Sequence, residues 1–339
     1  MEPSSNQQLI NSLLSYLPPA VAQEIHADPR PLREPRTHSF PAAVLLADVS
    51  GFTALTEKLA ASGPGGPEEL TFILNCYFSS MIGILDHEGG EVVQFSGDSL
   101  IATFPVEGQE ALSIAVRRAW QAATRMQAAM DEFATTATSA GPVALGMKIA
   151  IGAGEVTDLS VGGTEDRWQY MIAGDPLGQV AEAEHHARRG EILLSPEAQA
   201  LWTDAPLDPS PLARLLWPTA NDDLTAALCT HIPAAITHRL LAGQADWLSE
   251  LRRMSVLFLG IGGLSIGGPD SLALAQRCMI ALQKTVNHYE GSINKLLVDD
   301  KGMIGIVLFG APPLAHIDDP LRAVLCAADI HRTLSLIHI

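Results

Sequence analysis

Cysteine is scarce in this chain, and the four cysteines show neither a pairing pattern nor a metal-binding spacing. We expect Cys76, Cys229, Cys278 and Cys326 to be reduced and to lie in the core, which fits the cytoplasm. Long hydrophobic runs are also missing: SVLFLGIGG is far too short for a membrane span. The N-terminus has no basic segment followed by an apolar core, so we expect no signal peptide.

Positive charge is in short supply as well. The 339 residues include 21 lysines and arginines against 38 aspartates and glutamates, which gives a net charge of -17. This balance argues against a nucleic-acid-binding protein, because such a protein needs a basic surface. A nucleotide ligand is still allowed, since metal ions and a few local cations can hold phosphates. The length is sufficient for two domains with separate cores.

What the chain does contain is an apolar run that ends in a carboxylate, VLLADVSGFTALTEK at residues 44–58. Val44 to Ala47 do not alternate with polar residues, which predicts a strand buried on both faces. Asp48 follows at once, and an ionised carboxylate beside a buried strand is costly unless a cation compensates it. The alternative is that Asp48 caps the helix predicted from the residues after it.

The sequence also repeats itself. LPPAVAQEI followed by PAAVLLADVSGFTAL has a counterpart in IPAAITHRLL followed by RMSVLFLGIGGLSI, so that Val44 corresponds to Val256. Residues 89–104 and 290–310 each read as a β-hairpin that a glycine opens. An amphipathic helix is predicted after each hairpin. These elements indicate two copies of an α+β sandwich, in which helices pack on a mainly antiparallel sheet.

Only the first copy continues into two more strands, a helix and a closing strand. The final six residues, LSLIHI, are what a transposon end from a sequencing library would encode in frame, so we expect a truncated chain with a foreign tail. The alternative is a genuine short apolar tail. The predicted parts are an N-terminal helical lead (1–36), a first domain (37–203), a connector (204–250), a truncated second domain (251–333) and the tail (334–339).

A second carboxylate, Asp98, occupies the Ser-Gly-Asp turn of the first hairpin, and it approaches Asp48 if the two strands are neighbours. Two close carboxylates cannot both stay ionised at neutral pH without a cation. Oxygen ligands alone favour Mg²⁺ or Mn²⁺ over zinc, and such a pair can hold two ions for an attack at phosphorus. The alternative is a capped helix and an unrelated turn aspartate.

The predicted helix after the first strand opens with Ser50, Gly51, Phe52 and Thr53. Backbone amides at a helix start bind anions, and Gly51 lets the backbone come close to one. Two metal ions beside a helix start predict a binding site for a triphosphate.

These motifs resemble a known family. ADVSGFTALTEK, QFSGDSLIATF, LGMKIAIGAGEV and YMIAGDPLGQVAEAEHHA are similar to the catalytic domain of class III nucleotide cyclases. The tandem arrangement, LLAGQADWLSELRRMSVLFLGI and GSINKLLVDDKG resemble the soluble, bicarbonate-responsive adenylyl cyclases. The resemblance implies an α+β fold with two cyclase-type (ferredoxin-like βαββαβ) domains in tandem. They form a pseudo-twofold pair with the site between them, and the second domain is incomplete.

The resemblance also implies roles for the candidate residues. Asp48 and Asp98 match the two catalytic, metal-binding aspartates, and the carbonyl of Val49 matches a further metal ligand. Residues 50–53 match the segment that binds phosphate. Lys148, in MKIAIGAG, matches a basic position near the terminal phosphates. Alternatively, Lys148 is a strand-edge lysine in solvent.

Lys295 matches the lysine that reads the purine edge in adenylyl cyclases. An ammonium group only donates hydrogen bonds, so it favours an acceptor such as adenine N1 over the donors of guanine. Alternatively, Lys295 is a solvated lysine of the second hairpin. The implied reaction converts ATP into 3′,5′-cyclic AMP and pyrophosphate with two ions, Mg²⁺ or Mn²⁺.

The chain departs from the family pattern in its second site. Gly260 stands opposite Asp48, and Gln94 stands opposite Lys295, so we expect one catalytic and one degenerate site. Where bicarbonate-responsive relatives hold the anion with a lysine and an arginine, this chain has Gln94 and Ala181, which argues against bicarbonate activation. Two neighbouring histidines on the following helix point apart, and we expect His185 and His186 to be exposed.

The truncated second copy lacks the strands that carry the second base-selecting residue and the family's transition-state asparagine and arginine. We therefore expect the chain as printed to be inactive or weak. The expected partners are ATP and the paired domain, with no nucleic acid, no membrane span and further C-terminal domains. The alternative function is a cyclase-like module that binds ATP without converting it. A diguanylate cyclase is disfavoured, because its Gly-Gly-acid-acid-Phe turn is absent.

Overall fold

The computed structural model describes residues 5–63, 65–106, 108, 110–203, 221–243, 253–262, 270–299, 302–311 and 314–335. The contacts divide the chain into two compact units, which are described one at a time. Unit A comprises residues 40–156 and 174–214, and unit B comprises residues 1–39, 157–173 and 215–339.

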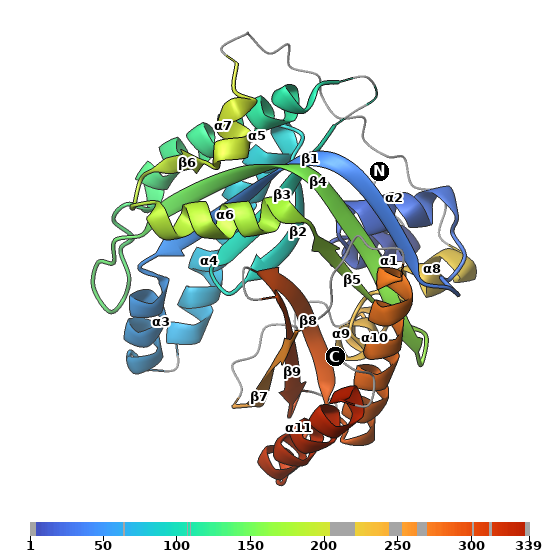
Figure 1. The fold of residues 1–339 in the computed structure, drawn as a ribbon. Coiled ribbons are helices and arrows are strands. Elements are labelled where there is room, and N and C mark those ends of the chain that lie inside the picture. The colour runs from blue at the N-terminus through green and yellow to red at the C-terminus, as the bar shows by residue number, and fades with distance from the viewer. Residues whose placement is uncertain are drawn as a thin grey trace. The chain divides into compact units, whose positions relative to one another are not determined.

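The secondary structure of the described residues is mixed (Figure 1). The helices are α1 (Ser5–Leu14), α2 (Pro19–Ala27), α3 (Phe52–Ala61), α4 (Gly66–His87), α5 (Leu112–Ala129), the 3₁₀ helix η1 (Met130–Phe133), α6 (Asp175–His186), α7 (Pro196–Ala200), α8 (Asp222–Cys229), α9 (Ala234–Leu241), α10 (Ser271–His288) and α11 (Asp319–Ser335). The strands are β1 (Arg36–Ser50), β2 (Glu91–Ser96), β3 (Ser99–Pro105), β4 (Gly146–Thr164), β5 (Arg167–Ala173), β6 (Ile192–Leu194), β7 (Ser255–Ile261), β8 (Ser292–Asp299) and β9 (Gly302–Phe309).

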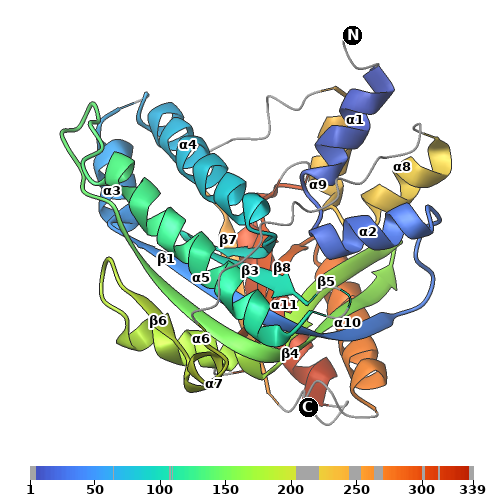
Figure 2. The same ribbon diagram turned by 90° about the horizontal axis from the view of Figure 1, so that it is seen from above.

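Unit A is a sheet with helices on both sides. The strand order is β2-β3-β1-β4, the first three strands are antiparallel, and β6 runs parallel to β4. One face of the sheet packs on α3, α4 and α5 to form a hydrophobic core. Figure 2 shows α4 and α5 on one side of the curved sheet and α6 on the other. β1 and β4 continue past unit A, and β5 pairs with the far half of β4.

The two faces of β1 differ in what they bury. Side chains alternate along a strand, and the odd-numbered residues from Ala43 to Val49 belong to the core under α4 and α5. Val44 and Asp48 therefore point to the opposite face. Val44 and Leu45 are both fully buried, which confirms the prediction of a strand covered on both faces.

Unit B has a second antiparallel sheet, in the order β7-β9-β8. Helices α10 and α11 form its core together with the hairpin at residues 157–173. Helices α1, α2, α8 and α9 make a separate apolar cluster. Two hydrogen bonds between the Gln276 side chain and the backbone of Gly162, of 2.8 and 2.7 Å, attach the hairpin to α10.

The repeat predicted from the sequence has a structural counterpart in the hairpins. β2 has a register shift between Val92 and Gln94, and β8 has one between Ile293 and Lys295. A bulge of this kind changes the direction of the strand and of its side chains. The predicted correspondence of Gln94 with Lys295 therefore agrees with the position of the bulge in each hairpin.

The first strands of the two copies agree in the same way. In unit A, Ile101 of the middle strand pairs with Gln94, the residue after the bulge, and with Leu46 of the first strand. In unit B, Ile306 pairs in the same way with Lys295 and Phe258. Two residues further along, Asp48 corresponds to Gly260, as the sequence alignment predicts. The tandem pseudo-twofold arrangement, with an incomplete second domain, stays a prediction.

The compact units do not follow the predicted domain limits, because the hairpin at 157–173 groups with unit B. Those limits therefore stay a prediction. Of the suspected tail, Leu334 and Ser335 belong to α11, and residues 336–339 lie outside the described residues, as do 204–220 and 244–250 of the connector.

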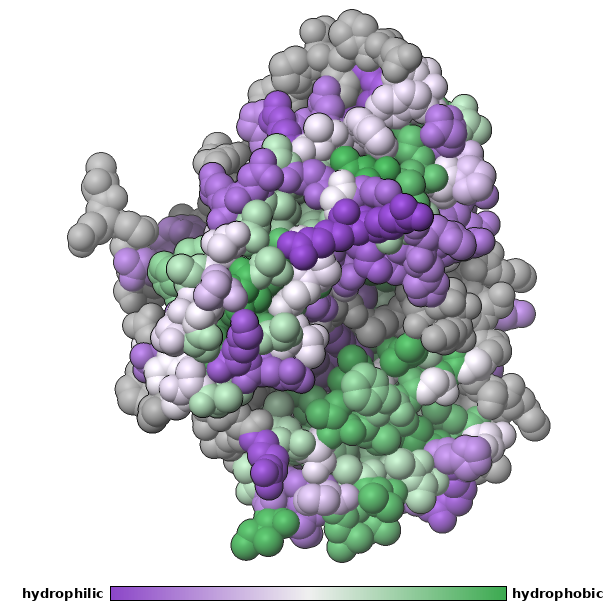
Figure 3. Space-filling model, turned by 90° about the vertical axis from the view of Figure 1, so that its left-hand side faces the viewer, coloured by the Kyte–Doolittle hydropathy of each residue, from purple (hydrophilic) through white to green (hydrophobic). Residues whose placement is uncertain are grey.

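Hydrophobic side chains are exposed on β7 and α11. Phe258 is 68% exposed, and Val256, Leu321 and Val324 are also exposed. Figure 3 shows hydrophobic residues gathered on one part of the surface, where they outnumber the polar ones. No described helix combines the length and the apolar character that crossing a bilayer requires.

A buried carboxylate in unit B gives a pH-dependent prediction. Asp158 is 7% exposed, and its Oδ1 accepts a hydrogen bond of 3.1 Å from the backbone N–H of His38. Burial, with a smaller effect of Glu24, raises the pKa of Asp158 to about 6. The folded protein thus holds this proton more tightly than the unfolded chain, so the stabilising effect of protonation is lost as the pH rises through 6.

We expect Asp158→Asn to raise the unfolding free energy by about 2 kcal/mol at pH 7.5, because asparagine cannot ionise yet still accepts from His38. The two proteins should be equally stable near pH 4. Urea denaturation at both pH values measures the difference. An equal difference at both pH values would contradict the assignment, because it would exclude a titrating group.

Candidate active site

Two predicted metal ligands lie on neighbouring elements of unit A. Asp48 is near the end of β1, and Asp98 is in the turn between β2 and β3. β3 pairs with β1 directly, with Ala47 opposite Leu100. The sheet thus brings the β2–β3 turn to the end of β1, as the sequence predicts.

Asp48 does not act as a helix cap. Its Oδ1 accepts a hydrogen bond of 2.8 Å from the hydroxyl of Ser99, and its Oδ2 lies 3.7 Å from Nζ of Lys148. The cap position of α3 belongs to Gly51, and within the described chain no side chain caps this helix. The structure therefore excludes the alternative interpretation of Asp48.

The two carboxylates interact. Burial raises the pKa of Asp98, and the charge of Asp48 raises it further. Burial and both carboxylates also raise the pKa of Tyr77, whose buried hydroxyl has no hydrogen-bond partner among the described residues. Tyr77 therefore stays neutral near two acidic groups. Such a pair of carboxylates is disfavoured in the ionised form unless a cation lies close.

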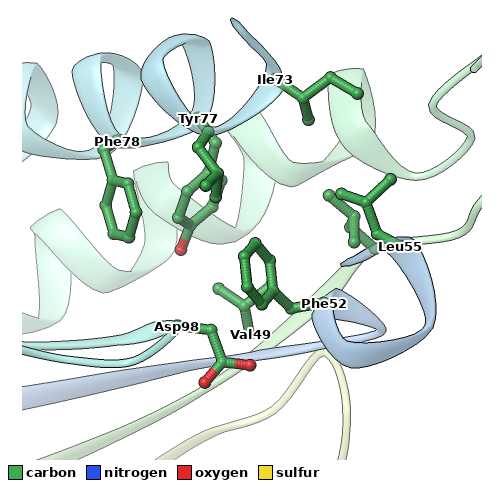
Figure 4. A pocket seen from close by; sticks show the side chains of 9 residues that line it. Val49, Phe52, Leu55, Ile73, Tyr77, Phe78 and Asp98 are labelled. Atoms are coloured by element: carbon green, nitrogen blue, oxygen red, sulfur yellow. The ribbon is translucent and has the colours of Figure 1, made fainter. Parts of the chain in front are cut away.

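Apolar side chains separate Asp98 from the core. Figure 4 shows Tyr77 and Phe78 projecting from α4 towards Phe52 and Val49, while the carboxylate of Asp98 points away from the rings. These residues line a cavity of about 10 Å³, which is too small for a substrate. The site thus has a closed apolar wall on this side.

The start of α3 depends on a glycine. Gly51 has a φ of +97°, which side chains rarely tolerate. A Cβ added there would lie 2.5 Å from the carbonyl oxygen of Ala144. The amides of Phe52 and Thr53 open the helix, and the neighbouring hydroxyl of Ser50 is buried without a hydrogen-bond partner in the described chain. These groups are available to an anion.

Lys148 is neither exposed in solvent nor free. It lies on β4 on the same face as Asp48, and its Nζ forms an ion pair with Glu184 of α6 as well as the longer one with Asp48. The hydrogen bond from Lys148 to Glu184, followed by the charges of both acidic residues, raises the pKa of Lys148. Lys148 thus links α6 to Asp48.

Glu184 is a site residue that the sequence analysis missed. Its side chain is 14% exposed, whereas His185 and His186 beside it are exposed, as predicted. A signal was present: Glu184 is the acidic residue on the helix face that turns towards the sheet. Only the packing of α6 against β4 shows that this face meets Lys148.

The donor atoms fit a divalent metal ion. Asp48 and Asp98 supply carboxylate oxygens, and Val49, the last residue but one of β1, can add its carbonyl. The described residues contain no group of three or more His, Cys, Asp or Glu that could hold a metal. A pair of carboxylates suits Mg²⁺, which usually completes its coordination with water and phosphate oxygens.

Lys295 belongs to unit B. It follows the bulge of β8 and is half-buried, and burial lowers its pKa. It is therefore not a fully solvated hairpin lysine. Its predicted contact with a purine stays a prediction.

Comparison with known proteins gives a family match. Residues 36–209 match the adenylate and guanylate cyclase catalytic domain. This segment contains Asp48, Asp98 and Lys148, together with the whole of unit A's sheet.

Two curated relatives and one solved structure illustrate the similarity. Adenylate cyclase type 10 of Oryctolagus cuniculus is 24% identical over 372 residues, which cover 96% of this chain and 22% of the relative. Photoactivated adenylate cyclase subunit beta of Euglena longa is 29% identical, over 52% of this chain and 19% of the relative. The adenylyl cyclase CyaB from P. aeruginosa is 26% identical with a TM-score of 0.42, over 49% of this chain and 82% of that one. The chain thus spans about a fifth of the length of the curated relatives.

Proposed function

The chain belongs to the adenylate and guanylate cyclase catalytic domain family, and from this membership we propose that it is part of an adenylate cyclase. The proposed reaction converts ATP into 3′,5′-cyclic AMP and pyrophosphate. The observation that carries the proposal is the pair of interacting carboxylates, Asp48 and Asp98, beside an uncapped helix start.

In the proposed reaction, the ribose 3′-oxygen forms a bond to the α-phosphorus. The bond from this phosphorus to the bridging oxygen of the β-phosphate breaks, and the hydroxyl proton passes to solvent. Two Mg²⁺ or Mn²⁺ ions held by Asp48, Asp98 and the Val49 carbonyl would supply positive charge for these changes. The amides of Gly51, Phe52 and Thr53 bind phosphate oxygens through the helix start.

Lys148 is proposed to bind the terminal phosphates, which then compete with Glu184 for its ammonium group. Removing the charge of Glu184 should therefore favour the bound triphosphate. We expect Glu184→Gln to tighten binding of a non-hydrolysable ATP analogue about three- to ten-fold, a size typical of a partly exposed ion pair. Isothermal titration calorimetry measures the effect.

The matched control for this prediction is the same substitution in a protein that also carries Lys148→Met. With the lysine absent, Glu184→Gln should change the affinity by less than half as much on the free-energy scale. An equal gain in both backgrounds would show that Glu184 acts on the nucleotide without Lys148, and the proposed competition would be wrong.

Lys295 is proposed to select adenine from the second half of the site. We expect Lys295→Glu to reduce the preference for ATP over GTP by about 100-fold, because a carboxylate accepts from the guanine edge that an ammonium repels. The measurement is kcat/KM for each nucleotide. Lys284→Glu is a control on an exposed lysine of the same unit, and an identical change in both variants would contradict the assignment.

A second candidate is a module that binds ATP with metal but does not convert it. Formation of cyclic AMP separates the two candidates, since both predict metal-dependent ATP binding.

A further inference from the structure

Unit B contains a cavity that is unrelated to the metal-binding carboxylates of unit A. Its volume is about 290 Å³, close to the lower end of the range for small-molecule sites. It lies between the turn of the β4–β5 hairpin, the start of α9, the end of α10 and the ends of β8 and β9. Figure 1 labels these elements around β5 and α10.

The cavity has a charged residue on its wall, Arg167. Burial lowers the pKa of this guanidinium to about 10, which still leaves it ionised at neutral pH. Its NH1 donates a hydrogen bond of 3.3 Å to the carbonyl of Cys229. Among the described residues, this carbonyl is its hydrogen-bond acceptor, and no carboxylate lies within ion-pair distance. A guanidinium has five donor N–H groups, so most of its capacity is unused.

The backbone around Arg167 is held firmly. The buried side chain of Gln283 on α10 accepts from the N–H of Thr164 at 3.1 Å and donates to the carbonyl of Arg167 at 2.8 Å. The next residue, Trp168, donates its backbone N–H to Thr230 at 2.9 Å. A side chain on such a fixed backbone is pre-organised, which lowers the entropic cost of binding.

Arg167 and Arg36 place positive charge near the imidazole of His231. The imidazole of His231 has a pKa lowered to about 4, mainly by burial and then by the charges of Arg167 and Arg36. The buried Nε2 of His231 has no hydrogen-bond partner among the described residues. A buried cation is costly unless it is paired, and among the described residues no carboxylate lies within ion-pair distance of Arg167.

The cavity wall also contains two carboxylates, Glu165 and Glu290, and neither pairs with Arg167. Glu290 is engaged by Arg322 at 2.5 Å and by His316 at 3.2 Å. Glu165 is exposed at the hairpin turn. Both have a positive φ, of 57° and 53°, which is uncommon outside glycine. In the first copy, Gly89 occupies the position that corresponds to Glu290 and has a φ of 77°. The second copy therefore keeps a positive φ there with a glutamate in place of glycine, which strains the backbone.

We propose that this cavity binds a small organic anion whose carboxylate or phosphate group pairs with Arg167. Asn287 and Ser292 supply further hydrogen-bond donors, and Ile293 and Leu308 line an apolar part of the wall. The anion completes the hydrogen bonding of the guanidinium, which is a strong charge-assisted interaction. The site does not depend on the proposed cyclase activity.

The test is calorimetric titration of the protein with benzoate and with phenyl phosphate at constant ionic strength. Each probe has one anionic group and one apolar ring, and benzyl alcohol is the neutral control. We expect saturable binding of at least one anion and none of the alcohol; the stronger of the two identifies the preferred head group. Arg167→Gln should weaken binding about ten-fold or more, while Arg332→Gln, on exposed α11, should leave it unchanged.

A second variant covers the case in which Arg167→Gln does not fold. Asn287→Leu narrows the cavity from α10 and leaves the arginine in place, so it should also weaken binding. The proposal is overturned if neither anion binds, if benzyl alcohol binds equally well, or if Arg332→Gln weakens binding as much as Arg167→Gln. Unchanged binding in Asn287→Leu overturns it too.

Discussion

Asp48→Asn should lower cyclic AMP formation about 1,000-fold or more in the protein expressed from its complete reading frame. The reason is that an amide cannot hold a divalent cation as a carboxylate does, and the loss of several kcal/mol of charge stabilisation corresponds to this factor. Asp98→Asn should have an effect of the same size. Initial rates at saturating ATP and Mg²⁺ measure both.

The fold should survive this substitution. Asparagine can still accept the hydrogen bond from Ser99 that Asp48 accepts at 2.8 Å. Removing the charge of Asp48 relieves the repulsion that, after burial, raises the pKa of Asp98. Thermal unfolding should therefore show no loss of stability. Asp131→Asn, on an exposed residue of η1, is the matched control and should keep full activity. Retention of a tenth of the activity in Asp48→Asn would rule out its role as a metal ligand.

Gly51→Ala should destabilise the protein by about 3 kcal/mol and remove nucleotide binding. A methyl group at a φ of +97° is strained. It would also lie 2.5 Å from the carbonyl oxygen of Ala144, so the turn at Gly51 must move away from the segment that precedes β4. That movement displaces the amides at the start of α3. Urea denaturation and titration with an ATP analogue measure the two effects.

Gly63→Ala is a control that separates the cost of the backbone strain from the cost of the close contact with Ala144. Gly63 has a φ of +102°, but a Cβ added there meets nothing within 4 Å. The control should therefore lose only about 1 kcal/mol, the cost of the backbone conformation, and should bind the analogue normally. Equal losses in the two variants would show that the close approach to Ala144 has no effect.

Local patterns predict much of unit A. The unbroken apolar run from Val44 to Ala47 predicts a doubly covered strand, and the turn containing Asp98 predicts the hairpin that brings it to Asp48. Gly51 is identifiable because only glycine suits a close backbone approach at a helix start. These features depend on residues close together in the sequence or on one antiparallel pairing.

The features that sequence patterns miss depend on long-range packing. Glu184 joins the site only because α6 lies on the face of the sheet that carries Lys148. The grouping of the hairpin at 157–173 with unit B is equally invisible, since β4 reads as one continuous strand. Arg167 gives no signal in the sequence, because its significance comes from the cavity and from the absence, in the described chain, of a carboxylate within ion-pair distance of its guanidinium.

The most direct measurement is the amount of cyclic AMP and pyrophosphate that the protein from the complete reading frame forms from ATP with Mg²⁺ or Mn²⁺. Equal amounts of the two products are predicted, with a lower kcat/KM for GTP than for ATP and about 1,000-fold less cyclic AMP from Asp48→Asn or Asp98→Asn. Tight, metal-dependent ATP binding without any cyclic AMP would contradict the proposed activity and would identify a nucleotide-binding module instead.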